Sequence, residues 1–130
     1  MQVAVEHPDM SEEARLAAYS TVSTSLALRS DHRLAELVDA AMPLGSGIGG
    51  KSALMEVDGK TVFVKRVPLT DIERLPENTG STANVFDLPS FCQYGIGSPG
   101  FGAWRELAAH TMTTNWVLGD RFPGFPLMHH

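Results

Sequence analysis

The feature that most constrains the fold of this chain is a two-residue turn, Asp58-Gly59, between two strand-like segments. Apolar residues alternate over 53–57, and β-branched or aromatic residues dominate 61–65. Asp-Gly is typical of tight hairpin turns because both positions tolerate a positive φ angle. The sequence therefore predicts an antiparallel β-hairpin across residues 53–67.

A glycine-rich run precedes this hairpin, with the sequence Gly45-Ser46-Gly47-Ile48-Gly49-Gly50. Lys65, fifteen residues after Gly50, closes the second strand of the hairpin. Backbone N–H groups in a glycine turn can approach phosphate oxygens, and a lysine on the following strand can pair with the same phosphates. This order of glycine turn, hairpin and lysine predicts a nucleotide site.

Helical patterns flank the glycine run and the hairpin. Asp9 with Glu12 forms a capping-box pattern for a helix running toward Leu28, and Ser30 or Asp31 can cap a second helix. A third helix is expected from 103 to about 118, and its predicted buried stripe holds Trp104, Leu107, Ala108, Thr111 and Met112, with Glu106 on the flank.

The remaining segments have little periodicity. Residues 68–102 contain four prolines and five glycines, which predicts a long insertion with one short strand near Phe91-Tyr94. The proline- and phenylalanine-rich segment 122–128 predicts a turn leading into another strand, with His129 and His130 as a free end.

Composition excludes several classes of protein. The net charge is −5, and the first 40 residues hold seven acidic against three basic side chains. Since no lysine or arginine cluster exists, nucleic acid is not an expected partner. Cys92 is the single cysteine, so an internal disulfide or a thiolate metal site is not expected. Neither a signal peptide nor a spanning segment is recognisable, which predicts a cytoplasmic protein without a membrane partner.

Two other glycine patterns are alternatives for nucleotide binding. Residues 45–52 match G-x-x-x-x-G-K-[ST], but a phosphate loop of that kind would need a helix starting near Lys51, and Asp58 follows too soon. Residues 95–100 match G-x-G-x-x-G of dinucleotide folds, with Asp120 about twenty residues on. Gln93 and Tyr94 are poor residues for the central parallel strand which that fold requires.

Taken together, three segments resemble the small lobe of a protein kinase of bacterial type. Leu44–Gly50 resembles the glycine-rich loop, Val62-Phe63-Val64-Lys65 the lysine strand, and Trp104-Arg105-Glu106-Leu107 the helix with the partner glutamate. The resemblance implies an α+β fold over 42–130, with an antiparallel sheet, one packed helix and a long insertion at about 68–102. Residues 1–41 would form an N-terminal helical extension.

The resemblance also implies roles for particular residues. The lysine of such kinases binds the α- and β-phosphates of ATP and the glutamate holds it, so Lys65 and Glu106 are the expected catalytic pair. The expected ATP-binding residues besides Lys65 are Leu44, Gly45, Ser46, Gly47, Gly50 and Phe63. The function implied is the ATP-binding portion of a serine/threonine protein kinase-like protein.

Three departures from the kinase pattern keep an alternative open. Ser52 stands where such kinases prefer a valine that covers the adenine. Phe63 replaces a small residue on the same face as Lys65, where it would crowd the adenine. The 130 residues contain neither the His-Arg-Asp loop nor the Asp-Phe-Gly motif, so the chain alone is expected to be inactive, and Mg²⁺ would be bound only by a full-length enzyme. The alternative is a non-catalytic, pseudokinase-type interaction domain with an unidentified protein partner.

Overall fold

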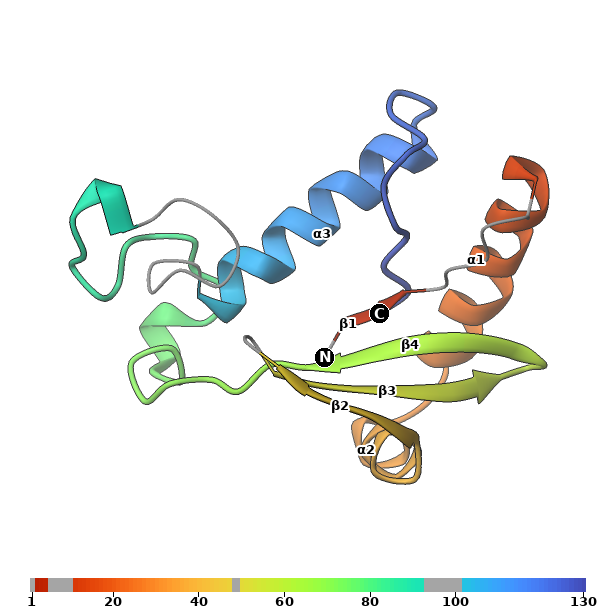
Figure 1. Cartoon of the computed structure of the whole chain (residues 1–130), viewed down its shortest axis with the longest axis horizontal. Coiled ribbons are helices and arrows are strands. Elements are labelled where there is room, and N and C mark those ends of the chain that lie inside the picture. Colours follow the sequence, from red (N-terminus) through yellow and green to blue (C-terminus); the bar gives the residue numbers. More distant parts are fainter. Residues whose placement is uncertain (1, 5–10, 48–49, 93–101) are drawn as a thin grey trace.

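A computed structural model describes residues 2–4, 11–47, 50–92 and 102–130 of the chain (Figure 1). The fold is α+β, as expected. A four-stranded antiparallel sheet has the strand order β1-β4-β3-β2, and three α-helices accompany it. The strands are β1 (Gln2–Ala4), β2 (Met42–Gly47), β3 (Gly50–Val57) and β4 (Lys60–Arg66).

The predicted hairpin is confirmed. β3 and β4 pair in register from Lys51 opposite Arg66 to Val57 opposite Lys60. Asp58 and Gly59 connect them with φ angles of 49° and 77°. Positive φ at both central positions matches the right-handed twist of the two strands, and this is why Asp-Gly is favoured here.

Two helices precede the sheet strands, α1 (Glu12–Ala27) and α2 (Asp31–Asp39). The hydroxyl of Ser11 accepts a hydrogen bond from Ala14 N, and that of Ser30 accepts one from Arg33 N. Each serine therefore satisfies one of the free backbone donors at its helix start. Ser30 was one of the two expected caps, whereas the first helix is capped by Ser11. Asp9, expected there, lies outside the described residues.

The main core lies between these helices and one face of the sheet. Its members are buried apolar residues of α1, α2, β3 and β4, namely Val22, Leu26, Leu34, Val38, Met55, Val57, Val62 and Val64. Alternation along a strand sends every second side chain to this face. Lys65 and Phe63 consequently belong to the opposite face.

The expectation of a purely helical extension with a single helix packed on the sheet is wrong in two respects. Residues 2–4 form β1, an edge strand paired with β4 from Gln2 opposite Lys65 to Ala4 opposite Phe63. In addition, α1 and α2 share one core with the sheet. The amphipathic pattern of α2 needs an apolar surface, and the valine face of the hairpin supplies it.

The third helix, α3 (Ala103–Leu118), is capped at its end by Gly119 as predicted. The predicted buried stripe is correct only in part, because Trp104, Leu107 and Ala108 are half-buried whereas Thr111 and Met112 are exposed. The buried residues of the helix are Glu106, Thr114 and Val117, while Met112 is 52% exposed. The helix turns a partly polar face inward because its partners there are Lys65 and a backbone N–H, both of which need polar groups.

Between β4 and α3 the described part of the insertion contains two 3₁₀ turns, η1 (Pro76–Asn78) and η2 (Ser90–Cys92). Phe91 therefore lies in a turn and not in a strand, and it is 79% exposed. The rest of the expected strand, toward Tyr94, lies outside the described residues. Figure 1 shows this segment, in green and cyan, gathered around the first turns of α3.

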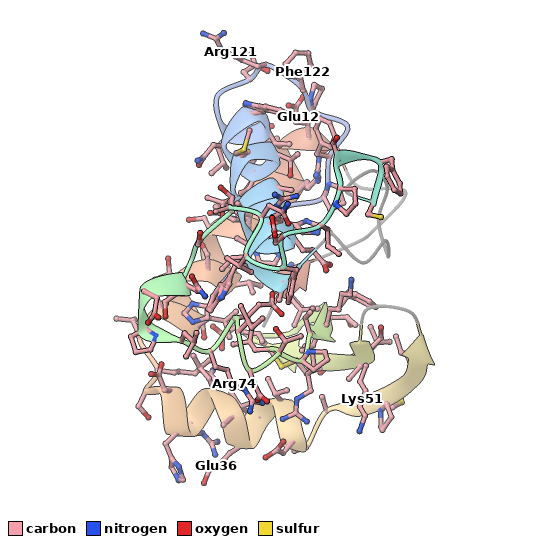
Figure 2. All side chains as sticks on the ribbon, turned by 90° about the vertical axis from the view of Figure 1, so that its left-hand side faces the viewer. Glu12, Glu36, Lys51, Arg74, Arg121 and Phe122 are labelled. Atoms are coloured by element: carbon pink, nitrogen blue, oxygen red, sulfur yellow. The ribbon has the colours of Figure 1, made fainter. Side chains whose placement is uncertain are left out.

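The C-terminal segment is packed against the helices, contrary to the expectation of a free end. Leu127 and His129 are buried, and Met128 N donates to the Thr114 hydroxyl of α3 at 2.9 Å. Arg15 of α1 donates to the carbonyl oxygens of Pro123 and Phe125. Figure 2 shows Glu12 of α1 and Phe122 of this segment at the same end of the molecule, opposite the end where Glu36 of α2 lies.

Among the residues described, no helix combines the length and apolar character needed to cross a membrane.

Candidate functional site

The site is built on the face of the hairpin opposite the valine core. Because directly paired residues of antiparallel strands share a face, the register defines two neighbouring cross-strand rows. The polar row holds Lys65 of β4, Ser52 of β3 and Gly45 of β2. The apolar row holds Phe63, Leu54 and Met42. The two rows are two residues apart along each strand, which corresponds to a distance of about 7 Å.

Lys65 is paired with Glu106 from the first turn of α3. The ammonium group donates to Glu106 Oε1, and the side chains are only 22% and 9% exposed. Partial burial weakens solvent screening of the pair but also removes hydration from both charges, so loss of either side chain would leave the other charge buried without a partner. The structure thus brings together the lysine and glutamate that the sequence singled out.

The glycine run closes the turn between β2 and β3, with Gly47 opposite Gly50. Gly50 has a φ angle of 134°, and a Cβ at that position would meet the carbonyl oxygen of Arg66. Gly45 has a φ angle of 132° and open space around it. Gly50 is therefore required by the close approach of β4, whereas Gly45 leaves unoccupied room at the end of the polar row.

Of the remaining expected ATP-binding residues, Phe63 lies in the apolar row, whereas Leu44 and Ser46 lie outside both rows. A break in the register falls between Pro43 and Gly45, so Leu44 lies at an irregularity of the strand pairing, 52% exposed. Ser46 pairs with Lys51 in the β2-β3 ladder. Phe63 is half-buried in the apolar row, two residues before Lys65.

A shallow groove begins at the apolar row. Its volume is about 560 Å³, and it runs from that row to the end of α2, lined among others by Leu37, Ala41, Met42, Leu54 and Thr61. Lys65 does not line this groove, which lies beyond the apolar row and away from the ammonium group.

His110 faces the same carboxylate from one turn further along α3. Its Nε2 lies 4.0 Å from Glu106 Oε1, the oxygen that accepts from Lys65. A protonated His110 would add positive charge beside Lys65. The sequence pattern contained this i, i+4 pair, since Glu106 and His110 necessarily share a helix face.

Sequence reasoning missed Glu73, which is only 4% exposed. Its Oε2 accepts a hydrogen bond from Ala103 N at 2.8 Å, at the start of the helix that carries Glu106. The position of Gly102 before that helix was a signal that its cap comes from elsewhere, because glycine has no side-chain acceptor. The contact spans 30 residues and could not be located by pattern.

The structure excludes one of the two alternative glycine-rich nucleotide motifs, and the other lies outside the described residues. Lys51 lies on β3 and no helix starts there, so the phosphate-loop interpretation of 45–52 is wrong. The second pattern, 95–100, lies outside the described residues. Over the described ranges, no group of three or more His, Cys, Asp or Glu side chains is placed to hold a metal ion.

Comparisons of the chain with protein-family models, with curated proteins and with solved structures return no match. The function of the site is therefore inferred from its own residues and their geometry.

Proposed function

We propose that this chain is the ATP-binding small lobe of a serine/threonine protein kinase-like protein. The observation that carries the proposal is the partly buried ion pair of Lys65 and Glu106, which joins the strand after a glycine hairpin to a separate helix. In kinases, a strand lysine held by a helix glutamate contacts the nucleotide phosphates.

The two cross-strand rows support a nucleotide as the ligand. The polar row offers the Lys65 ammonium, the Ser52 hydroxyl and open backbone at Gly45 to phosphates. The neighbouring apolar row offers Leu54 and Met42 to a base, with the Phe63 ring beside them. Since the rows are about 7 Å apart, a ligand with an anionic end and a flat apolar end matches them in order.

The proposal concerns nucleotide binding and not phosphoryl transfer by these 130 residues. Their sequence contains neither of the motifs that supply the catalytic base and the Mg²⁺ ligands in kinases. Mg²⁺ and a protein substrate accordingly belong to the proposed full-length enzyme. When bound, the metal would neutralise charge on the phosphates, while this chain's part is to orient them through Lys65.

The test is an ATP titration followed by two-dimensional NMR. We expect shifts at Gly45, Ser52 and Lys65, and about 10- to 150-fold weaker binding in Lys65→Met, because a hydrogen bond to a charged group is worth roughly 1.5–3 kcal/mol. Lys51→Met is the matched control. Its side chain is exposed on the other face of β3, and it removes the same charge. Equal affinities of the two variants, or no binding by the wild type, would contradict the proposal.

A non-catalytic interaction domain is the second candidate, and Phe63 is the observation that favours it. Its ring lies on the face of Lys65, in the row where the base of a nucleotide would have to pack. If the ring excludes the base, the site would bind polyphosphate without nucleoside selectivity. Titration with inorganic tripolyphosphate beside ATP separates the candidates, since an ATP-binding lobe should prefer ATP.

A further inference from the structure

The start of α3 is held by a residue from outside the helix. Gly102, the residue before the first turn, provides no side-chain hydrogen bond to it. Glu73 provides one instead, because its Oε2 accepts from Ala103 N at 2.8 Å. A carboxylate at a helix N-terminus satisfies a free donor and interacts favourably with the helix dipole.

Glu73 is also fixed to the chain that leaves β4. Its Oε1 accepts hydrogen bonds from Thr70 N at 3.1 Å and from the Thr70 hydroxyl at 2.9 Å. Its backbone carbonyl accepts from Trp104 Nε1 at 2.9 Å. One buried residue thereby ties the segment five residues after Lys65 to the first turn of α3.

Two residues near the start of α3, Gly102 and Arg105, support this contact between Glu73 and the helix. A Cβ on Gly102 would lie 2.9 Å from Glu73 Oε2, so the absence of a side chain leaves room for the carboxylate. Arg105 Nε donates to the carbonyl of Thr82 at 2.8 Å, which gives the first turn of α3 a third hydrogen bond with the same segment, after those of Ala103 and Trp104.

We propose that Glu73 is a positioning residue that holds Glu106 against Lys65, so that the segment 68–92 controls whether the pair forms. Glu106 lies three residues after Ala103, within the first turn that Glu73 holds. Glu106 lies on the rigid first turn of this helix. Loss of the hydrogen bond from Ala103 N to Glu73 would therefore move the Glu106 carboxylate away from β4. The positioning of Glu106 by Glu73 does not depend on the proposed function, and only the effect of Glu73 on nucleotide binding rests on that function.

The direct test is the side-chain ammonium resonance of Lys65 in protein labelled with ¹⁵N-lysine, identified by its loss in Lys65→Met. Hydrogen-bonded ammonium protons exchange slowly with water, so the resonance reports the contact with Glu106. We expect Glu73→Ala to abolish the resonance while the amide signals of the valine core stay in place. Glu77→Ala is the matched control, because Glu77 is an exposed acid of the same segment. A resonance unchanged in Glu73→Ala would overturn the proposal.

A second variant keeps the proposal testable if Glu73→Ala does not fold. Gly102→Ala leaves the carboxylate present but places a methyl group against it, and it should weaken the same resonance. Retention of the full resonance in a folded Gly102→Ala protein, with Ala103 N still protected from hydrogen exchange, would count against the role of Glu73.

Nucleotide binding separates the two proposals. If ATP binds the wild type, Glu73→Ala should lower its affinity about tenfold, as expected for loss of a charged contact. If ATP does not bind but the Lys65 resonance still depends on Glu73, the positioning role stands and the proposed function fails. If ATP binds wild type and Glu73→Ala equally and the resonance persists, the function stands and the positioning role fails.

Discussion

Gly50 at the start of β3 lies so close to the end of β4 that a Cβ at position 50 would stand 1.9 Å from the carbonyl oxygen of Arg66. This contact brings the glycine turn against the strand that carries Lys65. One glycine of the run is therefore a packing requirement of the hairpin, independent of any ligand.

The first prediction compares two glycines with nearly the same backbone angle. Gly50→Ala should destabilise the protein more than Gly45→Ala, because both pay for a side chain at positive φ but only position 50 meets backbone atoms. Urea unfolding measures the difference, which should exceed about 1 kcal/mol. Equal losses would mean that β4 can move away from the turn without cost.

The second prediction concerns the stability of the Lys65 and Glu106 pair. Lys65→Met alone should cost about 2–4 kcal/mol in the free energy of unfolding, because it leaves the buried carboxylate of Glu106 without its cation. The double variant with Glu106→Leu should recover much of that loss, since neither charge is then buried unpaired. Additive losses in the double-mutant cycle would show that the two side chains do not interact in solution.

The third prediction rests on the proposed function and concerns Phe63. Phe63→Ala should strengthen ATP binding and leave tripolyphosphate binding unchanged, because it opens the apolar row without touching Lys65. Calorimetric titration of both ligands gives the comparison. Leu54→Ala, the residue paired with Phe63, is the control for a general loss of apolar contact. Weaker ATP binding in Phe63→Ala would indicate that the ring stacks on the base.

The fourth prediction concerns pH and His129, whose pKa is lowered from 6.5 to about 4 by burial. The unfolded chain takes up a proton as pH falls through 6.5, whereas the folded state resists protonation until about pH 4. Stability should therefore fall on acidification between these values, by up to roughly 3 kcal/mol.

Replacing His129 tests this dependence. His129→Phe keeps a ring beside Tyr19, whose centroid lies 5.2 Å from the imidazole, and should flatten the stability profile between pH 6.5 and 4. His32→Phe is the control, since the His32 side chain is 86% exposed. An unchanged profile in His129→Phe would show that other groups cause the acid sensitivity.

Local sequence determined several elements of this protein. Asp58-Gly59 predicted the hairpin because only a few residue pairs tolerate its backbone angles, and Ser30 and Gly119 marked helix ends for similar local reasons. The pairing of Lys65 with Glu106 was expected only through a resemblance, since spacing alone cannot say that residues 41 apart will meet.

The tertiary structure determined which helix faces are buried and which residues cap the helix ends. Periodicity put the apolar residues of α3 inside, yet the helix buries Glu106 and Thr114, because the groups it meets are the ammonium of Lys65 and the backbone N–H of Met128. Likewise, Glu73 caps a helix that starts 30 residues later. The residues around a side chain in sequence indicate its preference for helix or strand. The group that the side chain contacts depends on how distant segments of the chain pack together, and a short stretch of sequence does not determine that packing.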